Sequence, residues 1–189
     1  MLHQQSALET PELLDQVLSF VDATKDLCAS ALVHSSWAHA AQAILFSDIG
    51  GLSVEAQRLL SLLLPILEES PRLPRLVRKL YLVRPSSTDL GRLANIQFPC
   101  LATLFLTAIS ISSEADTVGT QKLLQNPCLL SISVNGDFVR EEHFLRIWHG
   151  CTETIKHLSY YSSGNREFAF VPSETHRPPR RIKLESVGL

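Results

Sequence analysis

A short apolar pattern recurs along the second part of this sequence at nearly constant spacing. Its central residues are 24, 28, 26 and 26 positions apart, and they are Leu80, Leu104, Ile132, Leu158 and Leu184. In the first four copies an apolar residue lies three positions before the central one, and an apolar or aromatic residue lies two positions after it. The last copy is degraded. Because apolar alternation over four to six residues is typical of a strand, the recurrence predicts one strand in each copy.

The segments between these strands include two with helical character. They are residues 117–125 and residues 141–148, the second with Phe144, Leu145 and Trp148 on one face. Strand–helix units with a period in the twenties stack into a solenoid, in which parallel strands form a sheet and helices cover its other side. The alternative is a generic α/β domain with evenly spaced strands. Both interpretations give the α/β fold class.

These units resemble leucine-rich repeats. The strict motif of that family places Asn or Cys three residues past the last leucine of the strand. The corresponding residues of this chain are Pro85, Ile109, Asp137, Ser163 and Leu189. We therefore expect a short, irregular leucine-rich-repeat-like solenoid with parallel strands over residues 71–189.

The first fifty residues contain three short amphipathic helical patterns. Thr10 is a suitable N-cap for the first helix, and Pro11 suits its first position. Residues 22–24 offer a cap for the second helix, and Ser35 or Ser36 a cap for the third. Such short helices with tight connections predict a compact cluster. The apolar faces consist of Leu13, Leu14, Val17, Leu18 and Val21; Leu27, Ala31 and Leu32; and Trp37, Ala40, Ala41, Ile44 and Leu45.

Residues 9–49 are similar to an F-box of fungal type, the motif that docks a protein onto the adaptor of a ubiquitin ligase. The resemblance rests on Glu-Leu-Leu at 12–14, Leu-Val at 32–33 before Ser-Trp at 36–37, and Leu-Phe at 45–46. Glu9-Thr10 stands where most F-boxes have Leu-Pro. The resemblance implies five adaptor-binding residues; the alternative is that all five are core residues. They are Pro11, Leu14, Val17, Val33 and Trp37.

The domain organisation follows from these patterns. We expect an F-box-like helical domain over residues 1–50, a linker helix over 51–70 and the repeat region over 71–189. The apolar residues between 53 and 69 predict the linker helix, which Pro65 should kink or divide. We expect this helix to pack between the head and the first strand.

Charge is distributed unevenly along the chain. Residues 1–69 contain nine acidic and two basic residues, whereas residues 70–189 contain ten acidic and fifteen basic ones. The densest basic stretch is a candidate binding site for an acidic or phosphorylated target. The alternative is a solvated face of loop and strand. The stretch has one aromatic residue, fewer than nucleic-acid binding needs. Its basic residues are Arg72, Arg75, Arg78, Lys79 and Arg84.

Sequence signatures of catalysis are weak. The chain has neither a glycine-rich phosphate loop nor a G-x-S-x-G elbow. Two groups of metal-binding residue types lack the spacing of a zinc site. They are Cys28, His34 and His39, and His143, His149, Cys151 and His157. We therefore expect no enzymatic activity, no metal and no cofactor; a metal-dependent hydrolase built on these groups is an alternative.

The sequence thus predicts a substrate-recruiting subunit of a cullin–RING ligase of the SCF type. Its head would bind a Skp-type adaptor and its repeats an unidentified target protein. The alternative is a non-catalytic interaction scaffold whose head only caps the repeats. The longest apolar run, residues 59–67, is too short to cross a bilayer. With no secretory signal visible and four widely spaced cysteines, we expect an intracellular protein, cytoplasmic or nuclear, without membrane or nucleic-acid partners.

Overall fold

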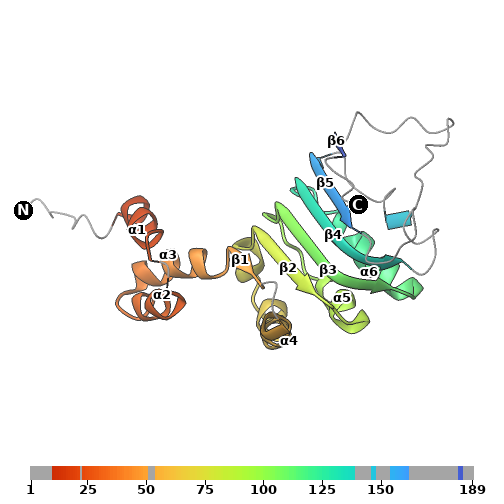
Figure 1. Ribbon diagram of the computed structural model, residues 1–189. Helices are drawn as coiled ribbons and strands as arrows, with labels where there is room; N and C mark the ends of the chain where they lie inside the picture. Colours follow the sequence, from red (N-terminus) through yellow and green to blue (C-terminus); the bar gives the residue numbers. More distant parts are fainter. Residues whose placement is uncertain are drawn as a thin grey trace, which may run out of the picture. The chain divides into compact units, whose positions relative to one another are not determined.

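The computed structural model describes residues 10–21, 23–50, 54–138, 146–147, 154–161 and 183–184 (Figure 1). The chain divides into two compact units between Ile49 and Gly50, one residue from the predicted boundary of the head. The helix predicted as a separate linker belongs to the second unit. Each unit is described by itself.

The first unit, called the head, contains the three predicted helices. They are α1 (Pro11–Leu18), α2 (Thr24–Ser30) and α3 (Ser35–Leu45), and the short strand β1 (Asp48–Ile49) follows them. Helix α3 packs against both α1 and α2. The core consists of Leu14, Leu18, Leu27, Ala40 and Ala41, and Trp37 and Ile44 are among the half-buried residues around it.

The caps of the head differ from those expected. Thr10 is the N-cap of α1, but its side chain makes no capping hydrogen bond. The N-cap of α2 is Ala23, which has no capping side chain. His34, not Ser35 or Ser36, caps α3: its Nδ1 atom accepts a hydrogen bond from the Ser36 amide at 3.3 Å and lies 2.8 Å from Ser36 Oγ. An imidazole nitrogen thus replaces the expected hydroxyl.

From residue 54 to residue 138 the second unit alternates helical segments and strands, as predicted. It begins with α4 (Val54–Glu69) and the 3₁₀ turn η2 (Leu73–Arg75). The elements that follow are β2 (Lys79–Val83), α5 (Ser87–Leu93), β3 (Thr103–Ile111), α6 (Glu114–Leu124), β4 (Ser131–Phe138), β5 (His157–Tyr161) and β6 (Lys183–Leu184).

Strands β2 to β6 are parallel and neighbour one another in chain order. The hydrogen-bonding register aligns the five central residues of the sequence pattern in one row: Leu80, Leu104, Ile132, Leu158 and Leu184. The predicted parallel sheet is confirmed, and the α/β class with it.

Within the second unit, a recurring set of backbone hydrogen bonds joins successive repeats where the strands begin. In the first three repeats, the carbonyl two residues before the central residue accepts hydrogen bonds from two consecutive amides of the next repeat, at 2.8–3.1 Å. These contacts link Arg78 to Ala102 and Thr103, Ala102 to Leu130 and Ser131, and Leu130 to Lys156 and His157. These backbone hydrogen bonds join neighbouring strands at the end where the strands begin.

One face of this sheet is buried beneath helices. Leu80, Leu82, Leu104 and Leu106 are fully buried, and α5 and α6 lie side by side on their side of the sheet (Figure 1). Gly119 of α6 lets this helix approach α5 closely, since a Cβ there would lie 3.3 Å from Leu90. We call the opposite side of the sheet the open face.

Helix α5 was not predicted, and α6 begins three residues before its predicted start. Both helices begin with a capping box. In each box the serine hydroxyl accepts a hydrogen bond from the backbone amide of an aspartate, and the carboxylate of that aspartate accepts one from the backbone amide of the serine. The pairs are Ser86 with Asp89, and Ser113 with Asp116. Of the helix predicted over 141–148, only residues 146–147 are described, and they are helical.

Helix α4 continues through Pro65, so the proline does not end it. The helix packs against β2 and α5. Arg92 of α5 donates to both carboxylate oxygens of Glu68, from Nε at 2.8 Å and from an Nη atom at 2.6 Å. The pair is exposed to solvent, so packing rather than charge fixes the helix.

Candidate interaction surfaces

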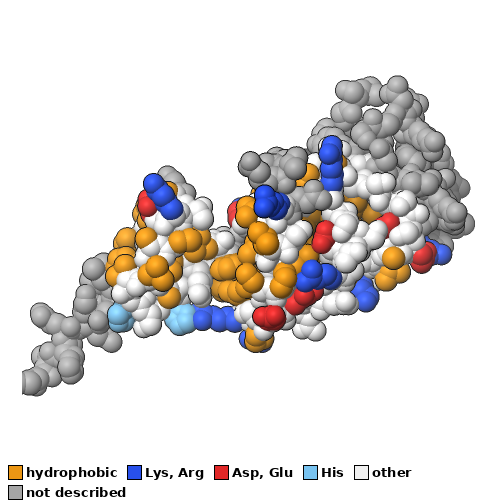
Figure 2. Space-filling view, turned by 90° about the horizontal axis from the view of Figure 1, so that it is seen from below, with side chains coloured by type: hydrophobic (Ala, Val, Ile, Leu, Met, Phe, Trp, Pro, Cys, Tyr) orange, Lys and Arg blue, Asp and Glu red, His pale blue; other side chains and the backbone are white. Residues whose placement is uncertain are grey.

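The head retains exposed apolar side chains around its closed core. Five large apolar residues of α1, the segment after it and the turn between α2 and α3 are between 43% and 88% exposed. We call this set the head surface: Leu13, Val17, Phe20, Leu32 and Val33. Figure 2 shows apolar side chains gathered on the visible side of this unit.

The apolar residues of α1 cover too wide an arc for the core to bury all of them. Leu14 and Leu18 lie one turn apart and are buried, whereas Leu13 and Val17 form a second row one residue behind and are exposed. Residues one position apart are rotated by about 100° on a helix, so the two rows face different directions. The outer row is therefore available to a partner.

The five predicted adaptor-binding residues have different environments. Val17 and Val33 are exposed at 47% and 67%, and both belong to the head surface. Leu14 is fully buried, which corrects the expectation that it contacts an adaptor, because its side chain fills the core between the helices. Trp37 is half-buried against that core. Pro11 occupies the first turn of α1, and its side chain lies outside the described residues.

Three residues of the head surface were missed in the sequence. Leu13 and Leu32 were assigned to helix faces that pack inward, and Phe20 was not considered. A signal was present for Phe20, since it lies two residues after the end of α1 and outside the inward spacing of Leu14 and Leu18. Periodicity alone could not separate Leu13 from Leu14.

The five basic residues between 72 and 84 are all exposed, but they do not form one patch. Arg72 is the N-cap of the η2 turn and Arg75 its last residue, and Arg78 and Lys79 lie where β2 begins. Arg84 follows the other end of this strand, where its φ of 47° is left-handed. A five-residue strand is about 16 Å long, so Arg84 is separated from the other four.

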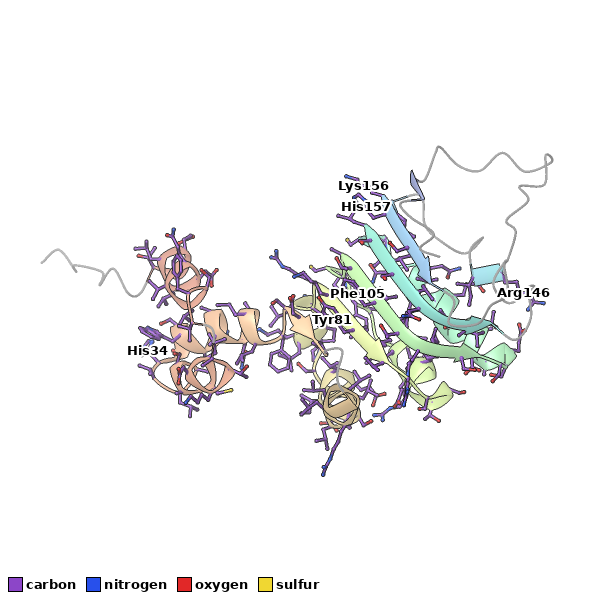
Figure 3. All side chains as sticks on the ribbon, viewed as in Figure 1. His34, Tyr81, Phe105, Arg146, Lys156 and His157 are labelled. Atoms are coloured by element: carbon purple, nitrogen blue, oxygen red, sulfur yellow. The ribbon has the colours of Figure 1, made fainter. Side chains whose placement is uncertain are left out.

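The open face carries a stacked aromatic pair, which Figure 3 shows on β2 and β3. The rings of Tyr81 and Phe105 are 2° from parallel, with centroids 4.4 Å apart. The register places them side by side, and both are half-buried. Each ring follows the central leucine of its repeat by one residue, a signal that the sequence interpretation did not use.

Polar and basic side chains extend this face across the strands. The row nearest the start of the strands contains Lys79, Thr103, Ser131 and His157. The second row contains Tyr81, Phe105, Ser133 and Ser159. All eight residues are exposed or half-buried, and none is acidic.

Asp116 is the one buried carboxylate among the side chains whose burial the structure describes, and its role is structural. Burial disfavours its charged form, but hydrogen bonds from the hydroxyls of Ser87 and Ser113 and the amides of Ser112 and Ser113 outweigh that effect and lower the pKa of Asp116. Its Oδ2 atom accepts from Ser113 Oγ at 2.7 Å and from the Ser113 amide at 3.0 Å. The carboxylate thus holds the start of α6.

The described part of the chain contains no three His, Cys, Asp or Glu side chains close enough to hold a metal ion. Of the sequence groups considered for this chemistry, His143, His149 and Cys151 lie outside the described residues. No described helix is both long and apolar enough to cross a membrane.

Comparison with known proteins gives no relative, since no family model, curated protein or solved structure matches this chain.

Proposed function

We propose that this chain is a substrate-recruiting subunit of a cullin–RING ubiquitin ligase of the SCF type. The head binds a Skp-type adaptor, and the second unit, an irregular leucine-rich-repeat solenoid, binds a target protein. The observation that carries the proposal is the head surface. Five large apolar side chains remain exposed on a three-helix unit whose core is already closed.

Burial of the head surface would contribute a substantial part of the free energy that docking requires. Burying a large apolar side chain contributes about 1.5–3 kcal/mol, whereas association costs about 4–15 kcal/mol in lost freedom of motion. Five such side chains therefore supply a contribution of the same size as this cost. The contact would be centred on Val17 and Val33, which are both exposed and part of the F-box resemblance.

The second unit suits the recruitment of a target. Its strands are parallel, and their central apolar residues are in register, which supports the resemblance to leucine-rich repeats. A stacked array offers a wide, rigid surface to a protein. Bond formation is left to the ligase partners, and the chain acts by raising the effective concentration of the target near them.

The alternative, a scaffold whose head merely caps the repeats, fits the head less well. A terminal cap of a repeat array needs a polar outer face. The described surface of this head instead includes Phe20 and Leu32, which are 80% and 88% exposed. These two residues favour a docking unit over a cap.

The test is co-purification of the full chain with a purified Skp-type adaptor. Val17→Glu and Val33→Glu place a charge in the head surface without entering the core. Val118→Glu is the matched control, because Val118 of α6 is 41% exposed, close to the 47% of Val17, and belongs to the second unit.

We expect the wild type and Val118→Glu to retain the adaptor, and the two head variants to lose it while keeping the wild-type circular dichroism spectrum. Retention of the adaptor by both head variants, or failure of the folded wild type to bind it, would overturn the proposal.

A further inference from the structure

The open face of the sheet has the composition of a binding site for an anionic peptide. Its first two rows, from Lys79 to His157 and from Tyr81 to Ser159, contain cationic, hydroxyl and aromatic side chains and no carboxylate. The hydrogen-bonding register aligns the four residues of each row side by side on the adjacent strands β2 to β5. Lys79 and the neighbouring Arg78 were among the target-binding residues expected from the sequence, whereas the other residues of the two rows were not.

Both ends of the first row are basic. Arg78 and Lys79 lie at its β2 end, and Lys156 and His157 lie at its β5 end, where Figure 3 shows them at the start of the strand. All four are exposed. Between them the row presents the hydroxyl groups of Thr103 and Ser131, which donate hydrogen bonds to anionic oxygens. A negatively charged segment is therefore complementary to the whole row.

The second row supplies an apolar anchor beside this charge. Tyr81 and Phe105 present a stacked aromatic pair directly next to Lys79 and Thr103, two residues further along the same strands. Aromatic side chains contribute strongly at binding sites because they bury much area at small conformational cost. The pair suits an aromatic or large aliphatic side chain of the partner.

The dimensions match an extended peptide. Adjacent strands are about 4.8 Å apart, so the row from Lys79 to His157 spans about 14 Å. Four extended residues cover this distance. A peptide lying across the strands can therefore reach both basic ends while one side chain rests on the aromatic pair.

We propose that the open face binds an acidic peptide segment, with its anionic groups along the row from Lys79 to His157 and an apolar side chain on Tyr81 and Phe105. This inference rests on the proposed function, since it names the chemistry of the segment by which a target is recruited. The anionic oxygens are those of glutamate or aspartate carboxylates.

The test uses the full chain and fluorescence anisotropy with labelled probes. The main probe is a random copolymer of glutamate and tyrosine, compared with polyglutamate, with a copolymer of lysine and tyrosine, and with a thymidine oligonucleotide. Short peptides of glutamate and tyrosine, with and without phosphoserine in place of glutamate, test the nature of the anion: binding that requires phosphoserine would overturn the assignment to carboxylates.

Three variants locate the binding site. Lys79→Glu reverses a charge of the first row, and Tyr81→Ala removes half of the aromatic pair. Lys122→Glu is the matched control for charge, because Lys122 is exposed on α6, on the helical side of the sheet. Lys79→Glu changes an exposed side chain, so it keeps the test decisive even where Tyr81→Ala weakens folding.

We expect the wild type to prefer the glutamate–tyrosine copolymer to every other polymer, and Lys79→Glu and Tyr81→Ala each to weaken its binding about tenfold. Lys122→Glu should bind as the wild type does. Equal binding by Lys79→Glu and Lys122→Glu, or no binding by the wild type, would overturn the inference. Preference for the oligonucleotide would also overturn it and indicate a nucleic-acid surface.

The adaptor measurement separates this inference from the proposed function. Val17→Glu should lose the adaptor and keep the copolymer, because its site lies in the other unit. Loss of copolymer binding with adaptor binding intact would remove only this inference. Loss of adaptor binding alone would remove the ligase role and leave the peptide-binding face in place.

Discussion

Leu14 and Val17 lie three residues apart on α1, yet Leu14 is fully buried and Val17 is 47% exposed. Leu14 packs into the core that joins the three helices of the head. Val17 contributes to the head surface instead. Substitutions at these two positions therefore test the stability of the head and its proposed binding separately.

Leu14→Ala should lower the free energy of unfolding of the head by about 3 kcal/mol, because it removes a fully buried side chain and leaves a cavity. Val17→Ala should change it by less than about 0.5 kcal/mol. Urea unfolding followed by the fluorescence of Trp37 measures both, in a Trp148→Phe background, since the chain has two tryptophans. Equal losses in the two variants would contradict the packing described for α1.

Asp116 and Asp89 make the same capping box at the starts of α6 and α5, but Asp116 is buried and Asp89 is partly exposed. Asp116→Ala should cost about 2 kcal/mol, because it leaves buried amide and hydroxyl groups without their acceptor. Asp89→Ala should cost about 1 kcal/mol, since water replaces its carboxylate. Denaturant unfolding followed by far-UV circular dichroism compares the variants, and a larger loss for Asp89→Ala would refute this ranking.

The stability contributed by the Asp116 carboxylate should depend on pH. Its pKa is lower in the folded chain than in the unfolded chain, where aspartate has a pKa of about 3.9. The contribution is therefore complete above that value and is lost as the pH falls through the folded pKa. Unfolding free energies measured from pH 6 down to about pH 3 should fall less steeply in Asp116→Asn than in the wild type. Parallel pH profiles would contradict the assignment.

Ala108 has a φ of 52°, a left-handed conformation, at the bulge of β3 where the register shifts between Thr107 and Ile109. This conformation costs an L-residue about 1–2 kcal/mol, and glycine avoids that cost. Glycine also gives the unfolded chain more conformational freedom, which offsets part of this advantage. Ala108→Gly should raise the free energy of unfolding by about 0.5–1 kcal/mol. Ala102→Gly is the control, because Ala102 is not left-handed and its replacement should lower stability. Destabilisation by Ala108→Gly would show that the side chain of Ala108 matters more than its backbone.

The sheet was predictable because its signal is a period. The recurrence of Leu80, Leu104 and Ile132 fixed both the existence of the strands and the row in which they align. The capping boxes would also have revealed α5, whose Ser86 and Asp89 have the expected spacing. This helix was missed because it has only seven residues and contains Gly91. Short helices leave few apolar positions from which to read a period.

The interaction surfaces were less accessible to sequence reasoning. Leu13 and Leu14 are adjacent members of one broad apolar arc, and only the packing of α3 decides which of them is buried. The stacking of Tyr81 on Phe105 joins residues from different repeats, so it depends on the register between strands. The basic stretch was visible in the sequence, but the length of β2 separates Arg84 from Arg78.

The most direct test of the central claim is titration calorimetry of the full chain with a purified Skp-type adaptor at several temperatures. The account predicts a one-to-one complex with a clearly negative heat-capacity change, because docking removes the apolar head surface from water. It also predicts loss of this signal in Val17→Glu and its retention in Val118→Glu. Absence of binding by the folded wild type, or binding unchanged by Val17→Glu, would contradict the claim that the head docks a ligase adaptor.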